Sequence, residues 1–254
     1  MTTPSTSPAR AGAWHGLIDT AKTLVFALLI ALVVRTVAYE PFEIPSGSMI
    51  PTLDIGDYLF ISKFAYGYSA YSLPLGLPLF TGRIFARAPK RGDVVVFKWP
   101  GDDSTDYIKR LIGLPGDRIQ VRNAILYVNG VAAQRRRIGD YVYREDGVTY
   151  HATQYIETLP NGVSHRILQD SDDGPLDNTP VFTVPPGHYF MMGDNRDRSA
   201  DSRDPQSGVG YVPAANLEGP AKFIFFSIRG AHPAWEFWYW PFEIRYGRLF
   251  AAVD

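Results

Sequence analysis

The 254-residue sequence contains no cysteine and no excess of charge of either sign. Without cysteine it has no disulfide, no thiolate-bound zinc or iron–sulfur centre and no thiol nucleophile. The 25 basic and 26 acidic residues leave a formal net charge of −1, whereas a nucleic-acid-binding protein should show a basic excess. We therefore expect no nucleic-acid partner. The apolar share of 46 % is enough to fill the core of one large domain or two small ones.

Motifs for cofactors and metals are also missing. The sequence has neither G-x-G-x-x-G nor a P-loop, which disfavours the parallel α/β folds that bind nucleotide cofactors. It has no H-E-x-x-H, and its acidic runs at 170–174 and 197–201 lack the glycine and final glutamate that a calcium loop needs at set positions. We expect no cofactor and no metal.

The histidines stand in no G-x-S-x-G or comparable context, which disfavours a Ser-His-Asp enzyme. Surface or structural positions are the simpler interpretation of all five. They are His15, His151, His165, His188 and His232.

The N-terminal region has one apolar run, and it is short. Residues 23–34 would span ~18 Å as a helix against a hydrocarbon core of ~30 Å, so a signal-peptide core and a buried helix are alternatives. Extension to residues 22–39 gives ~27 Å if both flanking cations reach the interfaces. Since no small-x-small cleavage site follows, we favour one uncleaved transmembrane anchor over 22–39. Basic residues before the run predict a cytoplasmic tail over 1–21 and an exported domain over 40–254.

From residue 57 onward the pattern is typical of an all-β domain. Short β-rich runs occur at 58–62, 93–97, 188–192 and 221–228, and no later stretch keeps a 3.6-residue period. The pairs Asn129-Gly130, Asp146-Gly147 and Asn161-Gly162 are hairpin turn signals. We predict a mainly β fold, a barrel or sandwich, with long loops at 65–89 and 169–180.

Three polar segments are the candidates for chemistry. Residues 41–53 place two serines around a glycine between prolines, residues 106–117 place Lys109 in a strand-like apolar stretch, and residues 193–203 are dense in carboxylates and guanidiniums. Each has an ordinary interpretation, namely a turn, a solvated lysine and a structural ion-pair loop. Strand alternation would point Lys109 and Arg110 to opposite faces.

Together the segments resemble bacterial type I signal peptidases, the membrane-anchored Ser/Lys endopeptidases that remove signal peptides from exported preproteins. The resemblance covers residues 22 to about 226 and is carried by four motifs in order. They are P-S-G-S-M-x-P-T-L at 45–53, R-G-D-V-V-V-F at 91–97, Y-I-K-R-x-I-G-L-P-G-D at 107–117 and G-D-N-R-D-x-S-x-D-S-R at 193–203.

The resemblance implies a role for each matching residue. Ser48 would be the nucleophile and Lys109 the general base, while the Ser46 hydroxyl and the Ser48 backbone N–H would form the oxyanion hole. Ser199 would hydrogen-bond and orient the lysine. A supporting ion-pair network would consist of Asp194, Arg196, Asp201 and Arg203. Apolar pockets for the small residues of a small-x-small cleavage site would be lined by Phe42, Ile44, Met49, Leu53, Tyr107 and Ile108.

Physical chemistry sets one condition on this assignment. A lysine with its ordinary pKa of ~10.4 is protonated at neutral pH and cannot accept the proton of serine. Burial against apolar neighbours would lower the pKa of Lys109 into the working range.

Other functions fit the sequence less well. A Ser/Lys self-cleaving repressor should carry a DNA-binding module where this chain has its apolar run. A silent, membrane-tethered β-domain that binds export partners would have no reason to keep Ser48, Lys109 and Ser199 together. The family tolerates insertions between its motifs, so the insertion-like region of about 130–180 receives no role beyond extra β-structure.

Aromatic residues are concentrated at 58–85 and 223–250. Tyr and Trp favour the membrane–water boundary. We therefore expect the segment 233–250, with part of 65–85, to contact the outer face of the bilayer beside the active site. The predicted partners are thus the signal peptides of preproteins and the lipid bilayer, and the predicted location is the bacterial inner membrane with the catalytic domain outside.

Overall fold

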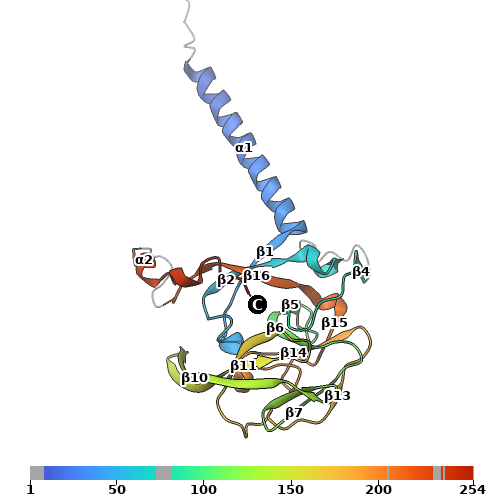
Figure 1. Ribbon diagram of the computed structural model, residues 1–254. Coiled ribbons are helices and arrows are strands. Elements are labelled where there is room, and N and C mark those ends of the chain that lie inside the picture. The colour runs from blue at the N-terminus through green and yellow to red at the C-terminus, as the bar shows by residue number, and fades with distance from the viewer. Residues whose placement is uncertain (1–8, 73–81, 205, 231–235, 237, 254) are drawn as a thin grey trace, which may run out of the picture.

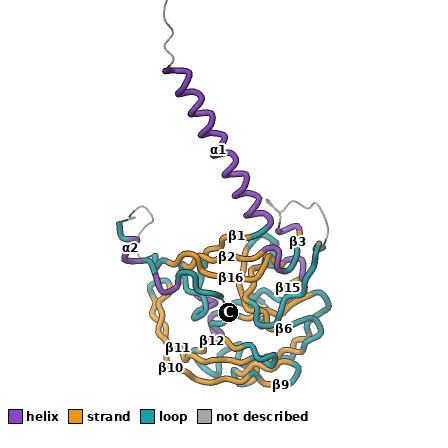
Figure 2. Tube along the Cα trace, turned by 45° about the horizontal axis from the view of Figure 1, so that its top comes forward, coloured by secondary structure: helices purple, strands orange, loops and turns teal. Residues whose placement is uncertain are grey.

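The structure is a computed structural model that describes residues 9–72, 82–204, 206–230, 236 and 238–253. A single long helix, α1 (Ala9–Val37), precedes a body built almost entirely of β-strands. In Figures 1 and 2, α1 stands clear of this body and joins it at β1. The prediction of a mainly β fold is confirmed.

The largest sheet has seven antiparallel strands and carries most of the chemistry. In spatial order they are β1 (Tyr39–Glu43), β2 (Asp57–Ser62), β16 (Leu217–Ser227), β5 (Val94–Lys98), β6 (Asp106–Gly113), β14 (His188–Met192) and β15 (Tyr211–Pro213). The last long strand of the chain, β16, therefore lies in the middle, where it pairs with β2 on one side and β5 on the other.

Three smaller sheets complete the body. One consists of β10 (Gln134–Glu145), β11 (Val148–Thr158) and β12 (Ser164–Gln169); a second of β13 (Phe182–Thr183), β7 (Arg118–Arg122), β8 (Ile125–Val128) and β9 (Val131–Ala132); a third of β3 (Tyr68–Ser69) and β4 (Arg83–Ile84). Short helices link them: η1 (Gly47–Met49), η2 (Lys63–Ala65), η3 (Ala70–Ser72), η5 (Arg196–Arg198), η6 (Ala214–Asn216), α2 (Trp240–Glu243) and η7 (Tyr246–Arg248).

The predicted hairpin turns are confirmed. Asn129-Gly130 joins β8 to β9 and Asp146-Gly147 joins β10 to β11, and all four residues have positive φ as a type I′ turn requires. The turn between β11 and β12 contains Asn161-Gly162. The expected region of extra β-structure consists mainly of β10, β11 and β12, in which β10 has 12 residues and β11 has 11.

Helix α1 includes most of the predicted anchor. Large apolar side chains from Leu24 to Val33 are exposed along it. Within the described residues, no helix combines the length and the hydropathy needed to cross a membrane.

The two aromatic stretches meet on the neighbouring strands β2 and β16 of the seven-stranded sheet. Phe60 of β2 contacts Phe223 and Phe225 of β16, with ring centroids 5.4 and 4.4 Å apart. Within the predicted segment 233–250, residues 233–235 and 237 lie outside the described residues. The large apolar side chains in the rest of that segment that are exposed are Trp238, Tyr239, Trp240, Phe242, Tyr246 and Phe250.

Candidate active site

Ser48 lies in the short helix η1, on the connection between β1 and β2. The proline-bracketed segment makes a tight turn here, in which Ile50 N–H donates to the Gly47 carbonyl at 3.1 Å. The Ser48 side chain is almost buried, with 9 % of the residue exposed. Its carbonyl oxygen accepts the backbone N–H of Asn195 at 3.1 Å, which ties the turn to the polar segment 193–203.

Lys109 reaches Ser48 from β6. Its Nζ donates to Ser48 Oγ at 2.7 Å and to the carbonyl oxygen of Ile108 at 3.1 Å. The ring of Tyr107 lies 5.4 Å from the same nitrogen. The structure therefore brings together the serine and the lysine that the sequence singles out, although they are 61 residues apart.

Burial lowers the pKa of Lys109 to about 8, even though the carboxylates of Asp201 and Asp194 favour the charged form. Only 3 % of Lys109 is exposed, and in the described chain no carboxylate lies within salt-bridge distance of Nζ. A lysine in this state supplies a substantial neutral fraction near neutral pH, as a base requires.

Arg110, the next residue of β6, binds a carboxylate. Its Nε and Nη2 donate to the two oxygens of Asp194, both at 2.8 Å, and its Nη1 donates to the Gly92 carbonyl at 2.7 Å. Burial alone would raise the pKa of Asp194, but the Arg110 guanidinium outweighs it and lowers that pKa.

The ion-pair network differs in membership from the predicted one. Arg196 pairs not with Asp194 or Asp201 but with Glu157 of β11, where Nη1 donates to Oε1 at 2.8 Å. Asp201 pairs with Arg203, and its Oδ2 also accepts the Gly193 backbone N–H at 3.0 Å. The four predicted residues are all buried here, so the network includes them together with Arg110 and Glu157, which the sequence analysis missed.

His165 is enclosed by this network. Burial lowers its pKa to about 4, so the ring is neutral, and Nε2 lies 3.4 Å from Glu157 Oε2. Neither ring nitrogen has a hydrogen-bond partner within the described chain. His165 therefore forms no Ser-His pair here.

Ser199 and Ser46 flank the pair in different ways. The Ser199 hydroxyl is buried and has no hydrogen-bond partner in the described structure, so the expected bond to Lys109 is not formed. The lysine instead uses Ser48 and Ile108, while Ser199 packs so closely against Gly193 that a Cβ there would lie 2.2 Å from its oxygen. Ser46 is exposed, has an extended backbone and does not cap η1.

Five of the six predicted pocket residues form one apolar cluster next to Ser48. Ile44, Met49 and Leu53 are buried in it, and Phe42 and Ile108 pack against it while partly exposed. Tyr107 joins the neighbouring cluster around Phe97 and Leu111 instead. Of these five residues, only Phe42 and Ile108 are partly exposed and present surface to solvent.

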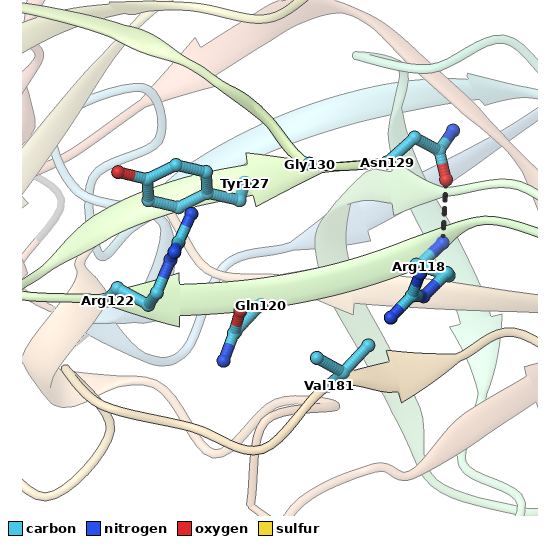
Figure 3. Close-up of a pocket in the computed structure, with 7 residues that line it drawn as sticks. All are labelled: Arg118, Gln120, Arg122, Tyr127, Asn129, Gly130 and Val181. Atoms are coloured by element: carbon cyan, nitrogen blue, oxygen red, sulfur yellow. Dashed lines mark hydrogen bonds between the residues drawn. The ribbon is translucent and has the colours of Figure 1, made fainter.

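A separate cavity of about 300 Å³ lies on the sheet of β7 and β8 (Figure 3). It contains none of the predicted site residues. Its lining residues are Arg118, Gln120, Arg122, Tyr127, Asn129, Gly130 and Val181. Within the part of the chain that the structure describes, no three His, Cys, Asp or Glu side chains are grouped so that they could hold a metal ion.

Comparisons with known proteins show which family the chain is similar to. The sequence model of the family described as signal peptidase, peptidase S26, matches residues 17–226. The proteins named signal peptidase I from Rickettsia typhi and Rickettsia prowazekii are each 47 % identical over 215 residues, covering 82 % of this chain and 79 % of theirs. A crystal structure of a signal peptidase I from Enterococcus faecalis is 30 % identical and matches 53 % of this chain and 97 % of its own, with a TM-score of 0.30. The chain belongs to the signal peptidase family, peptidase S26.

Proposed function

We propose that this serine endopeptidase cleaves signal peptides with Ser48 as nucleophile and Lys109 as general base. The observation that carries the proposal is the 2.7 Å contact between Lys109 Nζ and Ser48 Oγ, made by a lysine whose pKa is lowered to about 8. A serine hydroxyl is a weak nucleophile until an adjacent base takes its proton.

The reaction would follow from this pair. Neutral Lys109 accepts the proton of Ser48 while Oγ attacks the scissile carbonyl, and the resulting ammonium then protonates the leaving amine. Water hydrolyses the acyl-enzyme, with Lys109 as base again. The Ser48 N–H and the exposed Ser46 hydroxyl would stabilise the oxyanion.

Ser199 would orient the ammonium form of Lys109. A protonated lysine has three N–H donors, and two of them have partners in Ser48 and Ile108. The unpartnered Ser199 hydroxyl lies against Gly193, which also contacts the Ser48 carbonyl. A buried hydroxyl without a partner is unfavourable, so rotation of Ser199 toward the third N–H would satisfy both groups.

The enzyme would act on preproteins at the outer face of a bacterial inner membrane. The exposed apolar side chains of α1 support residues 22–39 as a single transmembrane anchor, with residues 1–21 in the cytoplasm and 40–254 exported. The exposed rings near the C-terminus support a second, peripheral contact with lipid. Small residues at the −3 and −1 positions of the preprotein would fit beside the partly exposed Phe42 and Ile108, which pack against a buried apolar cluster.

Cleavage of a preprotein with a small-x-small site tests the assignment. We expect Ser48→Ala and Lys109→Ala each to abolish cleavage while the protein stays folded, and exposed Lys90→Ala to remain active. Full activity in either dyad variant would refute the dyad. A reporter fused after Asp254 should be active only in the exported compartment, and activity in the cytoplasm would refute the orientation.

The lipid contact has its own test. In vesicles that contain brominated lipid, emission from the full chain should be quenched, and Trp238→Phe with Trp240→Phe should remove part of the quenching. Trp99→Phe, on the connection after β5, should not. Equal quenching in both variants would exclude contact of this segment with the bilayer.

A further inference from the structure

The β10–β11 hairpin reaches the turn that holds Ser48. Glu145, the last residue of β10, accepts the Gly47 backbone N–H on Oε1 at 2.8 Å. Its carboxylate lies so close that a Cβ on Gly47 would be 2.7 Å from Oε2. The absence of a side chain at Gly47 therefore lets the carboxylate approach the backbone between the two serines.

Strand β10 also holds the carbonyl of Gly47, through the side chain of Asn195. Asn195 Nδ2 donates to the Gly47 carbonyl at 3.0 Å and to the Tyr143 hydroxyl of β10 at 2.9 Å. The backbone N–H of Asn195 in turn donates to the Ser48 carbonyl. Three backbone groups of the turn, the Gly47 N–H and the carbonyls of Gly47 and Ser48, are thus held by hydrogen bonds to Glu145 or to Asn195, which itself contacts β10.

Apolar packing fixes the hairpin in this place. Tyr141 and Tyr143 pack against a small cluster of Ile50, Ala152 and Leu168. Ile50 directly follows η1. The hairpin therefore contacts the turn through the apolar side chain of Ile50 as well as through the backbone of Gly47.

We propose that Glu145 is a positioning residue for the nucleophile, which it holds through the Gly47 N–H, with Tyr143 in a weaker role through Asn195. The inference rests on the proposed role of Ser48. It gives the β10–β11 hairpin a part in the reaction although it contributes no group to the Ser48–Lys109 pair. Glu145 contacts the backbone of Gly47, whereas Lys109 contacts Ser48 and Ile108, so Glu145 would act through the geometry of the turn.

Replacement of Glu145 tests the proposal. Glu145→Ala should lower kcat roughly tenfold, the usual effect of losing a hydrogen bond to a charged group, with KM and the acid limb of the pH profile unchanged. Glu145→Gln keeps an acceptor oxygen and should restore most of kcat. Asp140→Ala removes an equal charge from the exposed face of β10 and should have no effect.

A double-mutant cycle with Gly47 tests the same contact without relying on one variant. Gly47→Ala should expel the Glu145 carboxylate and lower kcat, but it should add nothing in the Glu145→Ala background. Additive losses, an unchanged kcat in Glu145→Ala or a Gln variant as slow as the Ala variant would each overturn the positioning role. Activity in Ser48→Ala would instead overturn the nucleophile on which the inference rests.

Discussion

Lys109 and Arg110 are neighbours on β6 that are both buried but differ in the groups that they contact. Only 3 % of Lys109 and none of Arg110 is exposed. Arg110 meets both oxygens of Asp194, whereas Lys109 meets a hydroxyl and a carbonyl. Burial penalises a charge on either side chain, and only Arg110 has a carboxylate in contact to offset the penalty.

Pairing with a carboxylate, and not burial, thus distinguishes Arg110 from Lys109, the proposed base. Three buried arginines near Ser48 and Lys109 each contact a carboxylate: Arg110 contacts Asp194, Arg196 contacts Glu157, and Arg203 contacts Asp201. Lys109 contacts no carboxylate, and Asp201 and Asp194 act on it only at a distance. Lys109 can therefore lose its proton without leaving a carboxylate unpaired.

The largest expected effect compares the two residues directly. Lys109→Met should slow cleavage of the reporter preprotein by about 10³-fold or more without lowering the free energy of unfolding, since it removes an unpaired buried cation. Arg110→Met should lower the free energy of unfolding by about 3–5 kcal/mol, because Asp194 stays buried without its partner. Cleavage rates and denaturant unfolding of both variants measure this. Equal destabilisation by the two substitutions would remove the distinction.

Ser46→Ala extends the comparison to an exposed side chain of the same turn. Loss of one oxyanion donor should lower kcat by roughly 10²-fold. The melting temperature should not change, because the hydroxyl is exposed and caps nothing. Exposed Ser171→Ala is the matched control. An unchanged kcat in Ser46→Ala would remove Ser46 from the oxyanion hole.

The pH profile distinguishes the unpaired cation from the paired ones. Activity should fall about tenfold per pH unit below an acid limb near the Lys109 pKa of about 8, since only the neutral amine accepts a proton. The pKa is lower in the folded than in the unfolded state, so folding releases protons and stability should rise with pH from about 8 toward the ordinary lysine pKa of ~10.4. This rise should vanish in Lys109→Met. Its persistence would assign the titration to another group.

Ser199→Ala should have the smallest effect. Loss of the one additional hydrogen bond to the ammonium should slow cleavage by several-fold to roughly tenfold. The acid limb should move to lower pH, because the charged form of Lys109 loses a stabilising partner. Cleavage rates measured from pH 6 to 10 test both effects. Wild-type rates throughout would leave Ser199 a packing residue beside Gly193.

The sequence predicted the strands and the Ser48–Lys109 pair better than it predicted the hydrogen bonds and ion pairs that surround this pair. Turn dipeptides and β-rich runs place hairpins locally, and the motifs identify the family by residue order alone. The partner of Arg196 could not be read in this way, because Glu157 is brought to it by the pairing of β10, β11 and β12 far along the chain. The one available sign of this pair was Glu157 itself, a charged residue within a run of strand-forming residues. Glu145, in an Arg-Glu-Asp-Gly turn, has the local sequence of an ordinary solvated hairpin tip.

The central position of β16 also has a consequence for the order of events during synthesis. Ser48 belongs to the half of the large sheet formed by β1 and β2, and Lys109 to the half formed by β5 and β6. Only residues 217–227 join these halves within the sheet. A chain that is synthesised from its N-terminus therefore completes the sheet that carries Ser48 and Lys109 on its two halves only after residues 217–227 have been made.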